Sequence, residues 1–176
     1  AYGHGLPQIV TAAKRAGVDG FAVATIDEGV WLRQFGVKLP ILILGVTPAT
    51  YVADLAKYDL IPVVASETWL DDALSQLNSE ATLTVSVAVD TGMGRIGIRD
   101  RAELERVVAK LNAADNVVFQ GIGMHFATAD GNDTVYFEKQ LAKWHELTDE
   151  LDLPADIWRH LANSGTSLWH EQPSTD

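Results

Sequence analysis

Leu83-Thr84-Val85-Ser86-Val87-Ala88-Val89-Asp90-Thr91-Gly92-Met93-Gly94-Arg95-Ile96-Gly97 is the stretch that decides the fold. Its first half, residues 83–89, is a short apolar run, and its second half is a turn that contains three glycines. Near-continuous runs of Val, Ile and Leu are typical of parallel strands that are buried on both faces. Further runs of this kind predict strands at 20–25, 40–45, 61–66, 117–122 and 157–161.

Between these runs, apolar residues recur with the period of a helix. Leu104, Val107, Val108 and Leu111 lie at positions i, i+3, i+4 and i+7, which places them on one helical face. The same spacing predicts helices around 6–13, 27–36, 48–57, 67–79, 104–111 and 137–151. Regular alternation of strands and helices predicts a parallel sheet, either doubly wound or closed into a barrel. A (β/α)8 barrel has eight strands, so on the barrel reading one strand precedes the six and another follows them.

Composition excludes several classes of function. The chain has 176 residues, with 24 acidic and 13 basic side chains and a formal net charge of -11. This charge argues against binding nucleic acid or an anionic membrane surface, both of which require a basic face. The sequence has no cysteine, which excludes disulfides and thiolate chemistry and fits a reducing cytoplasm. Its histidines show no metal-ligand spacing, and no apolar stretch is long enough to span a membrane.

Polar residues that suit an anionic ligand follow three of the predicted strands. Arg95 projects from the glycine-rich turn, and His125 follows the run at 117–122. Asn163 and Ser164 open a segment whose hydroxyl and backbone N–H groups suit a phosphate. Each feature has a structural alternative, namely a surface arginine, a satisfied core histidine and a plain helix cap. Because strand ends carry the chemistry in both candidate folds, together they predict a site for a phosphorylated small ligand.

In order and spacing, six segments of the chain resemble alanine racemase. They are Ala1-Tyr2-Gly3-His4-Gly5, Asp19-Gly20-Phe21-Ala22-Val23-Ala24, Ile41-Leu42-Ile43-Leu44-Gly45, residues 90–97, His125-Phe126-Ala127 and His160-Leu161-Ala162-Asn163-Ser164. The resemblance implies a pyridoxal-phosphate enzyme with an N-terminal (β/α)8 barrel, a C-terminal β domain and active sites at a homodimer interface. It also implies a cytoplasmic protein that interconverts L- and D-alanine by two-base proton transfer on the cofactor aldimine, for peptidoglycan supply.

The resemblance also assigns roles to residues at matching positions. Tyr2 and Ser164 would contact the cofactor phosphate, with Asn163 beside it, and Leu44 would pack near the cofactor. Arg95 would bond the phenolic oxygen of the cofactor and help orient the substrate carboxylate. His125 would lie over the pyridine ring and orient the catalytic tyrosine of the partner subunit.

The chain departs from the family pattern at several functional positions. Ala88 occupies the place where many members carry a carbamylated lysine that steadies Arg95. Either a bound anion such as chloride or a neighbouring side chain would take over that task, or Arg95 is less constrained. The Schiff-base lysine would lie three residues before Ala1, the pyridine-binding arginine just past Asp176, and the second base in the C-terminal domain. We therefore expect residues 1–176 to be one pyridoxal-phosphate-binding barrel domain that is incomplete at both ends, has about six of eight βα units, and is inactive alone.

Three other functions stay open on the sequence. A non-catalytic pyridoxal-phosphate-binding barrel would share the fold without needing the second base. A racemase or decarboxylase for a different amino acid would share the barrel, because the resemblance places most substrate-discriminating residues outside this chain. The third alternative is an inert remnant of a racemase.

Overall fold

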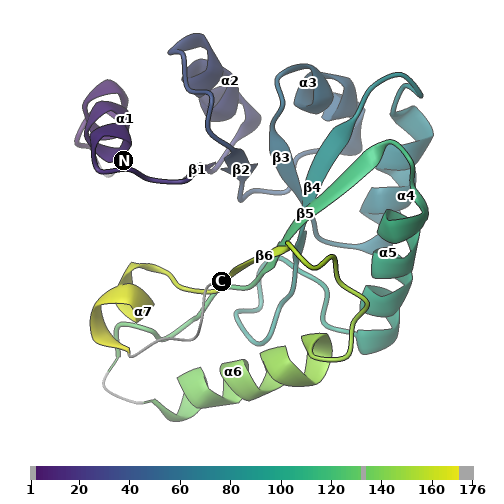
Figure 1. Ribbon diagram of the computed structural model, residues 1–176. Helices are drawn as coiled ribbons and strands as arrows, with labels where there is room; N and C mark the ends of the chain where they lie inside the picture. The colour runs from purple at the N-terminus through teal and green to yellow at the C-terminus, as the bar shows by residue number, and fades with distance from the viewer. Residues whose placement is uncertain (1–2, 132–133, 171–176) are drawn as a thin grey trace.

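The computed structural model describes residues 3–131 and 134–170, and its strands form a single curled sheet (Figure 1). The strands follow one another across the sheet in chain order, and every neighbouring pair is parallel. They are β1 (Phe21–Val23), β2 (Ile41–Ile43), β3 (Ile61–Val64), β4 (Leu83–Ala88), β5 (Val117–Gly123) and β6 (Trp158–His160). A doubly wound sheet reverses its strand order at a switch point, and this sheet does not. The predicted partial (β/α)8 TIM-type barrel is therefore confirmed as a half-barrel of six parallel strands.

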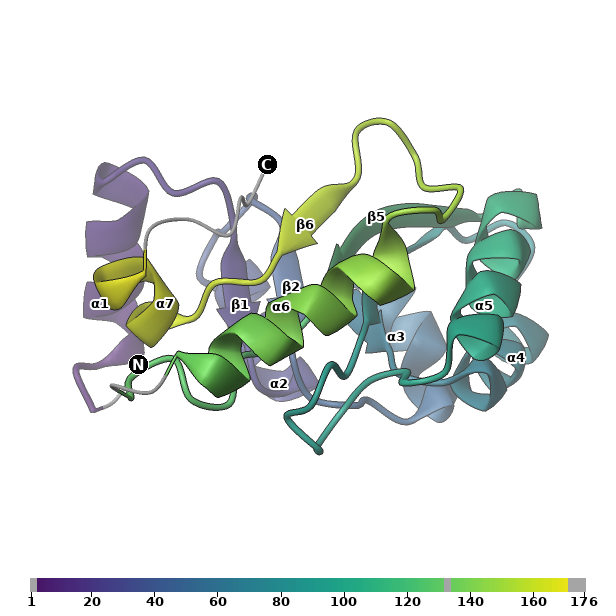
Figure 2. The same ribbon diagram turned by 90° about the horizontal axis from the view of Figure 1, so that it is seen from below.

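The helices lie on the outer side of the curl, except for the last one, which follows the final strand and lies at the edge of the curl (Figure 2). They are α1 (Leu6–Arg15), α2 (Ile26–Gln34), α3 (Val52–Lys57), α4 (Glu67–Gln76), α5 (Arg101–Ala113), α6 (Val135–Thr148) and α7 (Ser164–Trp169), with the short 3-10 helix η1 (Ala49–Tyr51) before α3. The predicted helix at 48–57 thus begins with a 3-10 turn after Pro48, and the one at 137–151 ends at Thr148. Element type follows the sequence pattern, and the boundaries move by a few residues.

Local signals explain where the helices start. In α2, the Thr25 hydroxyl accepts a hydrogen bond from the Glu28 N–H, and the Glu28 carboxylate accepts from the Thr25 N–H. This capping box satisfies two backbone donors that the first helical turn leaves unpaired. Asp100 caps α5 in a similar way by accepting from the Glu103 N–H. The helices therefore begin at fixed points after each strand end.

Burial differs between the middle and the ends of the sheet. All four residues of β3 are buried, and β4 is nearly as well covered. In β1, by contrast, Ala22 is exposed, and in β6 the Trp158 side chain is 42% exposed. The prediction that all six runs are buried on both faces is wrong for these two strands, and it is also wrong at Val118 in β5, which is 44% exposed. For β1 and β6 the reason is their position at the edges of an open curl, where no further strand covers them among the described residues.

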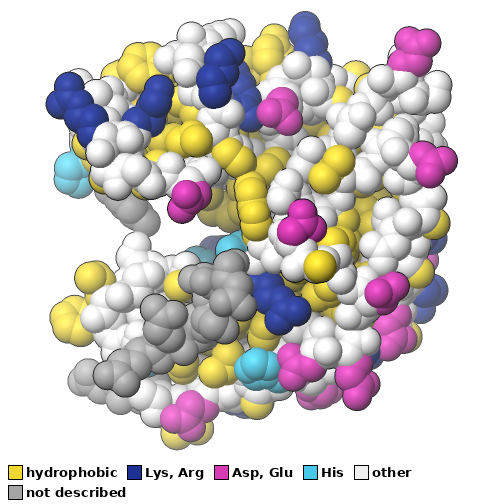
Figure 3. All heavy atoms as spheres, in the orientation of Figure 1, with side chains coloured by type: hydrophobic (Ala, Val, Ile, Leu, Met, Phe, Trp, Pro, Cys, Tyr) yellow, Lys and Arg dark blue, Asp and Glu magenta, His cyan; other side chains and the backbone are white. Residues whose placement is uncertain are grey.

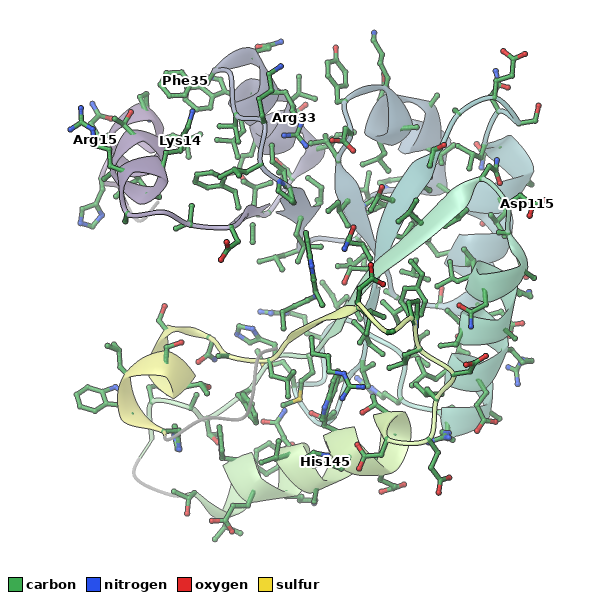
Figure 4. All side chains as sticks on the ribbon, viewed as in Figure 1. Lys14, Arg15, Arg33, Phe35, Asp115 and His145 are labelled. Carbon is green, nitrogen blue, oxygen red and sulfur yellow. The ribbon has the colours of Figure 1, made fainter. Side chains whose placement is uncertain are left out.

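Arg33 joins loops at the amino ends of the strands (Figure 4). Its Nε donates to the Tyr58 carbonyl at 2.9 Å, and one terminal nitrogen donates to the carbonyls of Val37 and Leu39 at 3.0 and 2.7 Å. These carbonyls lie in the segments that lead into β2 and β3. The other terminal nitrogen contacts the carbonyl and the carboxylate of Asp59. Because its donors are occupied in this way, Arg33 has a structural role at this end of the sheet.

Candidate functional site

A cavity of about 750 Å³ lies on the inner side of the sheet, towards the carboxyl ends of the strands. Each strand contributes at least one lining residue, in order Ala22, Leu42, Val63, Ala88, Gly123 and His160. In the space-filling view, the molecule is hollowed between the part that carries α1 and α2 and the part that carries α7 (Figure 3). Loops that follow β4, β5 and β6 add the polar groups of this cavity.

The loop after β4 is folded around the carboxylate of Asp90, which is 4% exposed. One carboxylate oxygen accepts from the N–H groups of Gly92 and Gly94 at 2.9 and 3.0 Å. The other lies 2.9 and 2.8 Å from two nitrogens of Arg99. Burial opposes ionisation of Asp90, but these donors outweigh it and hold the pKa of the carboxyl below its ordinary value. Gly94 has a φ of 76°, which a residue with a side chain rarely adopts.

This loop presents Arg95 to the cavity. The side chain is exposed, and it forms no ion pair with any residue that the structure describes. His125 lines the same cavity from the segment after β5. Partial burial, and secondarily the charge of Arg95, lower the pKa of the His125 imidazole below 6.5. At neutral pH the pair therefore consists of a cationic guanidinium beside a neutral imidazole, which suits an anionic ligand that carries an aromatic ring.

His160 is the polar residue that the sequence reasoning left without a role. Its Nε2, on β6, lies 3.0 Å from the hydroxyl of Ser86 on β4, so the contact spans the strand β5 between them. Burial lowers the pKa of His160 to about 4. The ring packs so closely on Gly123 that a Cβ there would lie 2.2 Å from His160 Cε1. His160 is therefore a neutral, tightly held imidazole at the cavity wall. No sequence motif indicates this role of His160, because its partner Ser86 is 74 residues away in the sequence.

Asn163 and Ser164 open α7 at the cavity edge. The Asn163 amide oxygen accepts from the Thr166 N–H at 2.9 Å, and its amide nitrogen donates to the Phe126 carbonyl at 3.1 Å. Both ends of this side chain are thus engaged in capping α7 and in joining it to the segment after β5. Ser164, by contrast, is exposed and lines the cavity together with Ser167. Asn163 places the loop, and Ser164 offers its hydroxyl to the cavity.

Comparisons with known proteins agree with this geometry. The sequence profile of the family described as "Alanine racemase, N-terminal domain" matches residues 1–176. The chain belongs to the alanine racemase N-terminal domain family. It is 45% identical over 172 residues to an alanine racemase of Ligilactobacillus salivarius and 41% identical over 173 residues to a lysine racemase of Oenococcus oeni. These alignments cover 97% and 98% of this chain and 46% of each relative.

Solved structures of racemases share the fold. An alanine racemase from E. faecalis superposes with a TM-score of 0.93 at 42% identity, over all of this chain and 47% of that one. A histidine racemase from Leuconostoc mesenteroides superposes with a TM-score of 0.91 at 34% identity, over 96% of this chain and 45% of that one. The chain thus spans less than half of the length of the racemases that it matches.

The half-barrel of this alanine racemase family member brings together most of the residues singled out in the sequence. Arg95, His125, Asn163, Ser164 and Leu44 all line the one cavity, and Leu44 is 49% exposed there. Their contacts with a cofactor stay predictions. Tyr2 lies outside the described residues.

Ala88 lines the cavity too. Within residues 3–131 and 134–170, no helix is long and apolar enough to cross a membrane, and no group of three metal-ligating side chains occurs. Sequence reasoning missed Asp90 and Arg99 as the pair that shapes the Arg95 loop. The Asp-x-Gly spacing is a signal that points to such a turn, since Asp side chains accept from N–H groups two residues on.

Proposed function

We propose that this chain forms the cofactor-binding barrel of an amino-acid racemase that uses pyridoxal phosphate. The observation that supports it most is the convergence of Arg95, His125 and Ser164, from three different strand ends, on one cavity of about 750 Å³. Family membership makes racemisation the leading reaction, and alanine is the proposed substrate. A cytoplasmic homodimer that supplies peptidoglycan with D-alanine is part of the same proposal.

The donor set of the cavity fits pyridoxal phosphate. The ligand combines a dianionic phosphate, a phenolic oxygen and a flat heteroaromatic ring. Arg95 has no carboxylate partner among the described residues, so its guanidinium is available for an oxyanion. Ser164 offers a hydroxyl at the rim, and a neutral His125 presents a flat face without adding a second charge. We assign the phosphate to Ser164, with Tyr2 and Asn163 beside it, the phenolic oxygen to Arg95 and the ring to His125 and Leu44.

Each side chain contributes a distinct task in this proposal. When bound, pyridoxal phosphate acidifies the α-proton of an amino acid, because its ring delocalises the carbanion. Arg95 would hold the phenolic oxygen and steer the substrate carboxylate, while the buried Asp90 keeps the Arg95 loop in shape. His125 would orient the ring. The apolar wall around Leu42 and Val63 would exclude water from the reacting carbon.

The proton-transfer groups are proposed to come from elsewhere. Racemisation needs a base on one face of the α-carbon and an acid on the other. No lysine or tyrosine lines the cavity in the part of the chain that the structure describes. We therefore assign the lysine base to a segment before this chain and the tyrosine to the partner subunit, as the family resemblance implies.

The cofactor assignment is tested by titrating the chain with pyridoxamine 5′-phosphate. This vitamer has no aldehyde, so it forms no imine with surface lysines and reports on the cavity alone. We expect saturable binding that is lost for pyridoxamine, which lacks the phosphate. Ser164→Ala should weaken binding about fivefold, the value of one net hydrogen bond of about 1 kcal/mol. Equal affinity for the two vitamers would refute the phosphate site.

The reaction is tested in a chimera. Residues 1–176 replace the matching segment of the L. salivarius alanine racemase, which the chain covers at 45% identity. We expect L- to D-alanine conversion, and we expect Arg95→Ala to slow it at least about tenfold, or 1.4 kcal/mol. Arg15→Ala, at the exposed end of α1, is the matched control and should retain the rate of the unmodified chimera. A chimera that binds pyridoxamine 5′-phosphate but racemises no amino acid would favour the non-catalytic alternative.

A second candidate is a racemase for a larger amino acid. The relatives named lysine racemase and histidine racemase, at 41% and 34% identity, favour this alternative over unrelated chemistry. Offering the chimera lysine and histidine beside alanine separates the two candidates.

A further inference from the structure

One fully buried polar side chain lies between the two loops of the site. Gln140 is on α6, outside the sheet, and is 0% exposed. Figures 1 and 2 show α6 running along the outside of the half-barrel, near the loop that follows β4. An uncharged amide in such a place must satisfy its donors and acceptor internally, because an unpaired buried polar group is costly.

Gln140 makes three hydrogen bonds to two different loops. Its amide nitrogen donates to the Thr91 hydroxyl at 3.3 Å and to the carbonyl of His125 at 3.1 Å. Its amide oxygen accepts from the Ala127 N–H at 2.9 Å. The orientation of the amide is unambiguous, since only the nitrogen end donates to a carbonyl and only the oxygen end accepts from an N–H.

These contacts connect the loop that carries Arg95 with the segment that carries His125. Thr91 lies in the loop that presents Arg95, and the His125 carbonyl belongs to the histidine that faces this arginine. The Thr91 hydroxyl, which accepts from Gln140, donates in turn to the Met124 sulfur at 2.9 Å. The two loops are therefore joined twice, once through Gln140 and once directly.

The same helix holds the Arg95 loop at a second point. The Tyr136 hydroxyl, one turn before Gln140, donates to the Gly92 carbonyl at 2.7 Å. It packs so closely that a Cβ on Gly92 would lie 2.7 Å from the Tyr136 oxygen. Since α6 is 14 residues long and hydrogen-bonded throughout, it offers a rigid support for both loops.

We propose that Gln140 is a positioning residue that sets the separation of Arg95 and His125 by tying both of their loops to α6. The inference rests on the proposed function, in which these two side chains hold one cofactor. Gln140 does not line the cavity, so it would act only through the loops. Its removal should let Arg95 and His125 move apart while leaving both side chains chemically intact.

The test measures the Arg95–His125 coupling directly, in the ligand-free chain. The titration of the His125 ring is followed by NMR, with its signal assigned through His125→Gln. Arg95→Gln should raise the His125 pKa, because the arginine charge lowers it. In the Gln140→Met background, the rise caused by Arg95→Gln should be clearly smaller. Met keeps the length and volume of Gln but forms none of the three hydrogen bonds.

Thr148→Val is the matched control. Thr148 lies on the same helix, is 1% exposed, and donates only within the helix, to the Trp144 carbonyl at 2.9 Å. The substitution therefore removes a buried polar group from α6 without changing a contact to either loop. We expect the full Arg95→Gln effect on His125 in this background. An equal effect in the Gln140→Met and Thr148→Val backgrounds would overturn the proposal.

Ligand binding supplies an independent readout. Gln140→Met should weaken pyridoxamine 5′-phosphate binding about tenfold, and Thr148→Val should leave it within twofold. If the unmodified chain does not bind this vitamer, the proposed function fails while the His125 titration still decides the role of Gln140. If the vitamer binds equally well to the unmodified chain and Gln140→Met, the positioning role fails and the cofactor site stands.

Discussion

Replacing Asp90 with asparagine tests whether one buried carboxylate shapes the loop that presents Arg95. Both carboxylate oxygens of Asp90 are occupied, one by the N–H groups of Gly92 and Gly94 and the other by Gly94 and Arg99. An asparagine oxygen still accepts from the two glycines. Its NH2 group, however, takes the place of the second oxygen and faces the donors of Arg99 and Gly94.

The size of the effect follows from these contacts. A hydrogen bond to a charged group contributes about 1.5–3 kcal/mol. Most of the effect should come from the loss of the negative charge that the backbone N–H groups face, because the Arg99 side chain is 65% exposed and its ion pair is screened by solvent. We therefore expect Asp90→Asn to lower the free energy of unfolding by about 2 kcal/mol. Arg99→Gln, the control, should lower it by less than about 1 kcal/mol.

Urea unfolding, followed by tryptophan fluorescence, measures both variants. With a slope of about 2 kcal/mol per molar urea, Asp90→Asn should move the midpoint down by roughly 1 M. Arg99→Gln should move it by less than half as much. A larger loss for Arg99→Gln than for Asp90→Asn would refute the argument, because the ion pair rather than the backbone donors would then hold the loop.

The stabilisation by Asp90 should also depend on pH in a definite direction. The folded-state pKa of Asp90 lies below its ordinary value of 3.8, so the ionised carboxylate stabilises the fold at every pH above that value. This stability is lost as the pH falls through the lower, folded-state pKa. The difference between the unmodified chain and Asp90→Asn should thus stay constant down to about pH 4 and narrow below it. A difference that narrows between pH 7 and 5 contradicts the depressed pKa.

Two further predictions concern the cavity wall. Because the His160 pKa falls from 6.5 to about 4 in the folded chain, only the unfolded chain takes up this proton between those values, and stability should fall by about 3 kcal/mol from pH 6.5 to 4. Thermal unfolding at several pH values should show a correspondingly smaller loss in His160→Gln, and an unchanged pH dependence would exclude a buried neutral imidazole. Gly123→Ala places a Cβ 2.4 Å from the His160 carbonyl oxygen, so it should destabilise the chain by about 2 kcal/mol in urea. A neutral outcome would mean that the β5–β6 contact is looser than described.

Periodicity predicted the sheet well, because parallel strands under helices have a pattern that is local in sequence. Each predicted strand overlaps an observed one, and the run at 83–89 contains β4 in full. Exposure was harder to predict, since it depends on whether another strand lies opposite. Ala22 sits in an apolar run like that around Val63, yet it is exposed because β1 lies at the edge of the curl.

Some residues of the site could be predicted from the sequence, and others could not. Arg95, His125 and Ser164 could be predicted as residues of one site, because each lies in the segment that follows a strand run and carries a group that suits an anion. Gln140 and the His160–Ser86 pair could not, because their partners are far away in sequence. Gln140 contacts residues 13 to 49 positions away, and Ser86 lies 74 positions from His160. Only the register of the strands and the placement of α6 bring these groups together.

Two of the site motifs pair a residue that shapes the loop with a residue that faces the cavity. Two exposed cavity residues have a less exposed polar neighbour whose side chain makes hydrogen bonds to the backbone. Asp90 does so for Arg95, and Asn163 does so for Ser164. We therefore expect Arg95 and Ser164 to make the main ligand contacts, and Asp90 and Asn163 to fix the shape of the loops that carry them. A substitution of Asp90 or Asn163 should consequently lower stability and ligand affinity together, whereas a substitution of Arg95 or Ser164 should lower affinity alone. This difference separates the two kinds of motif residue without any ligand-bound structure.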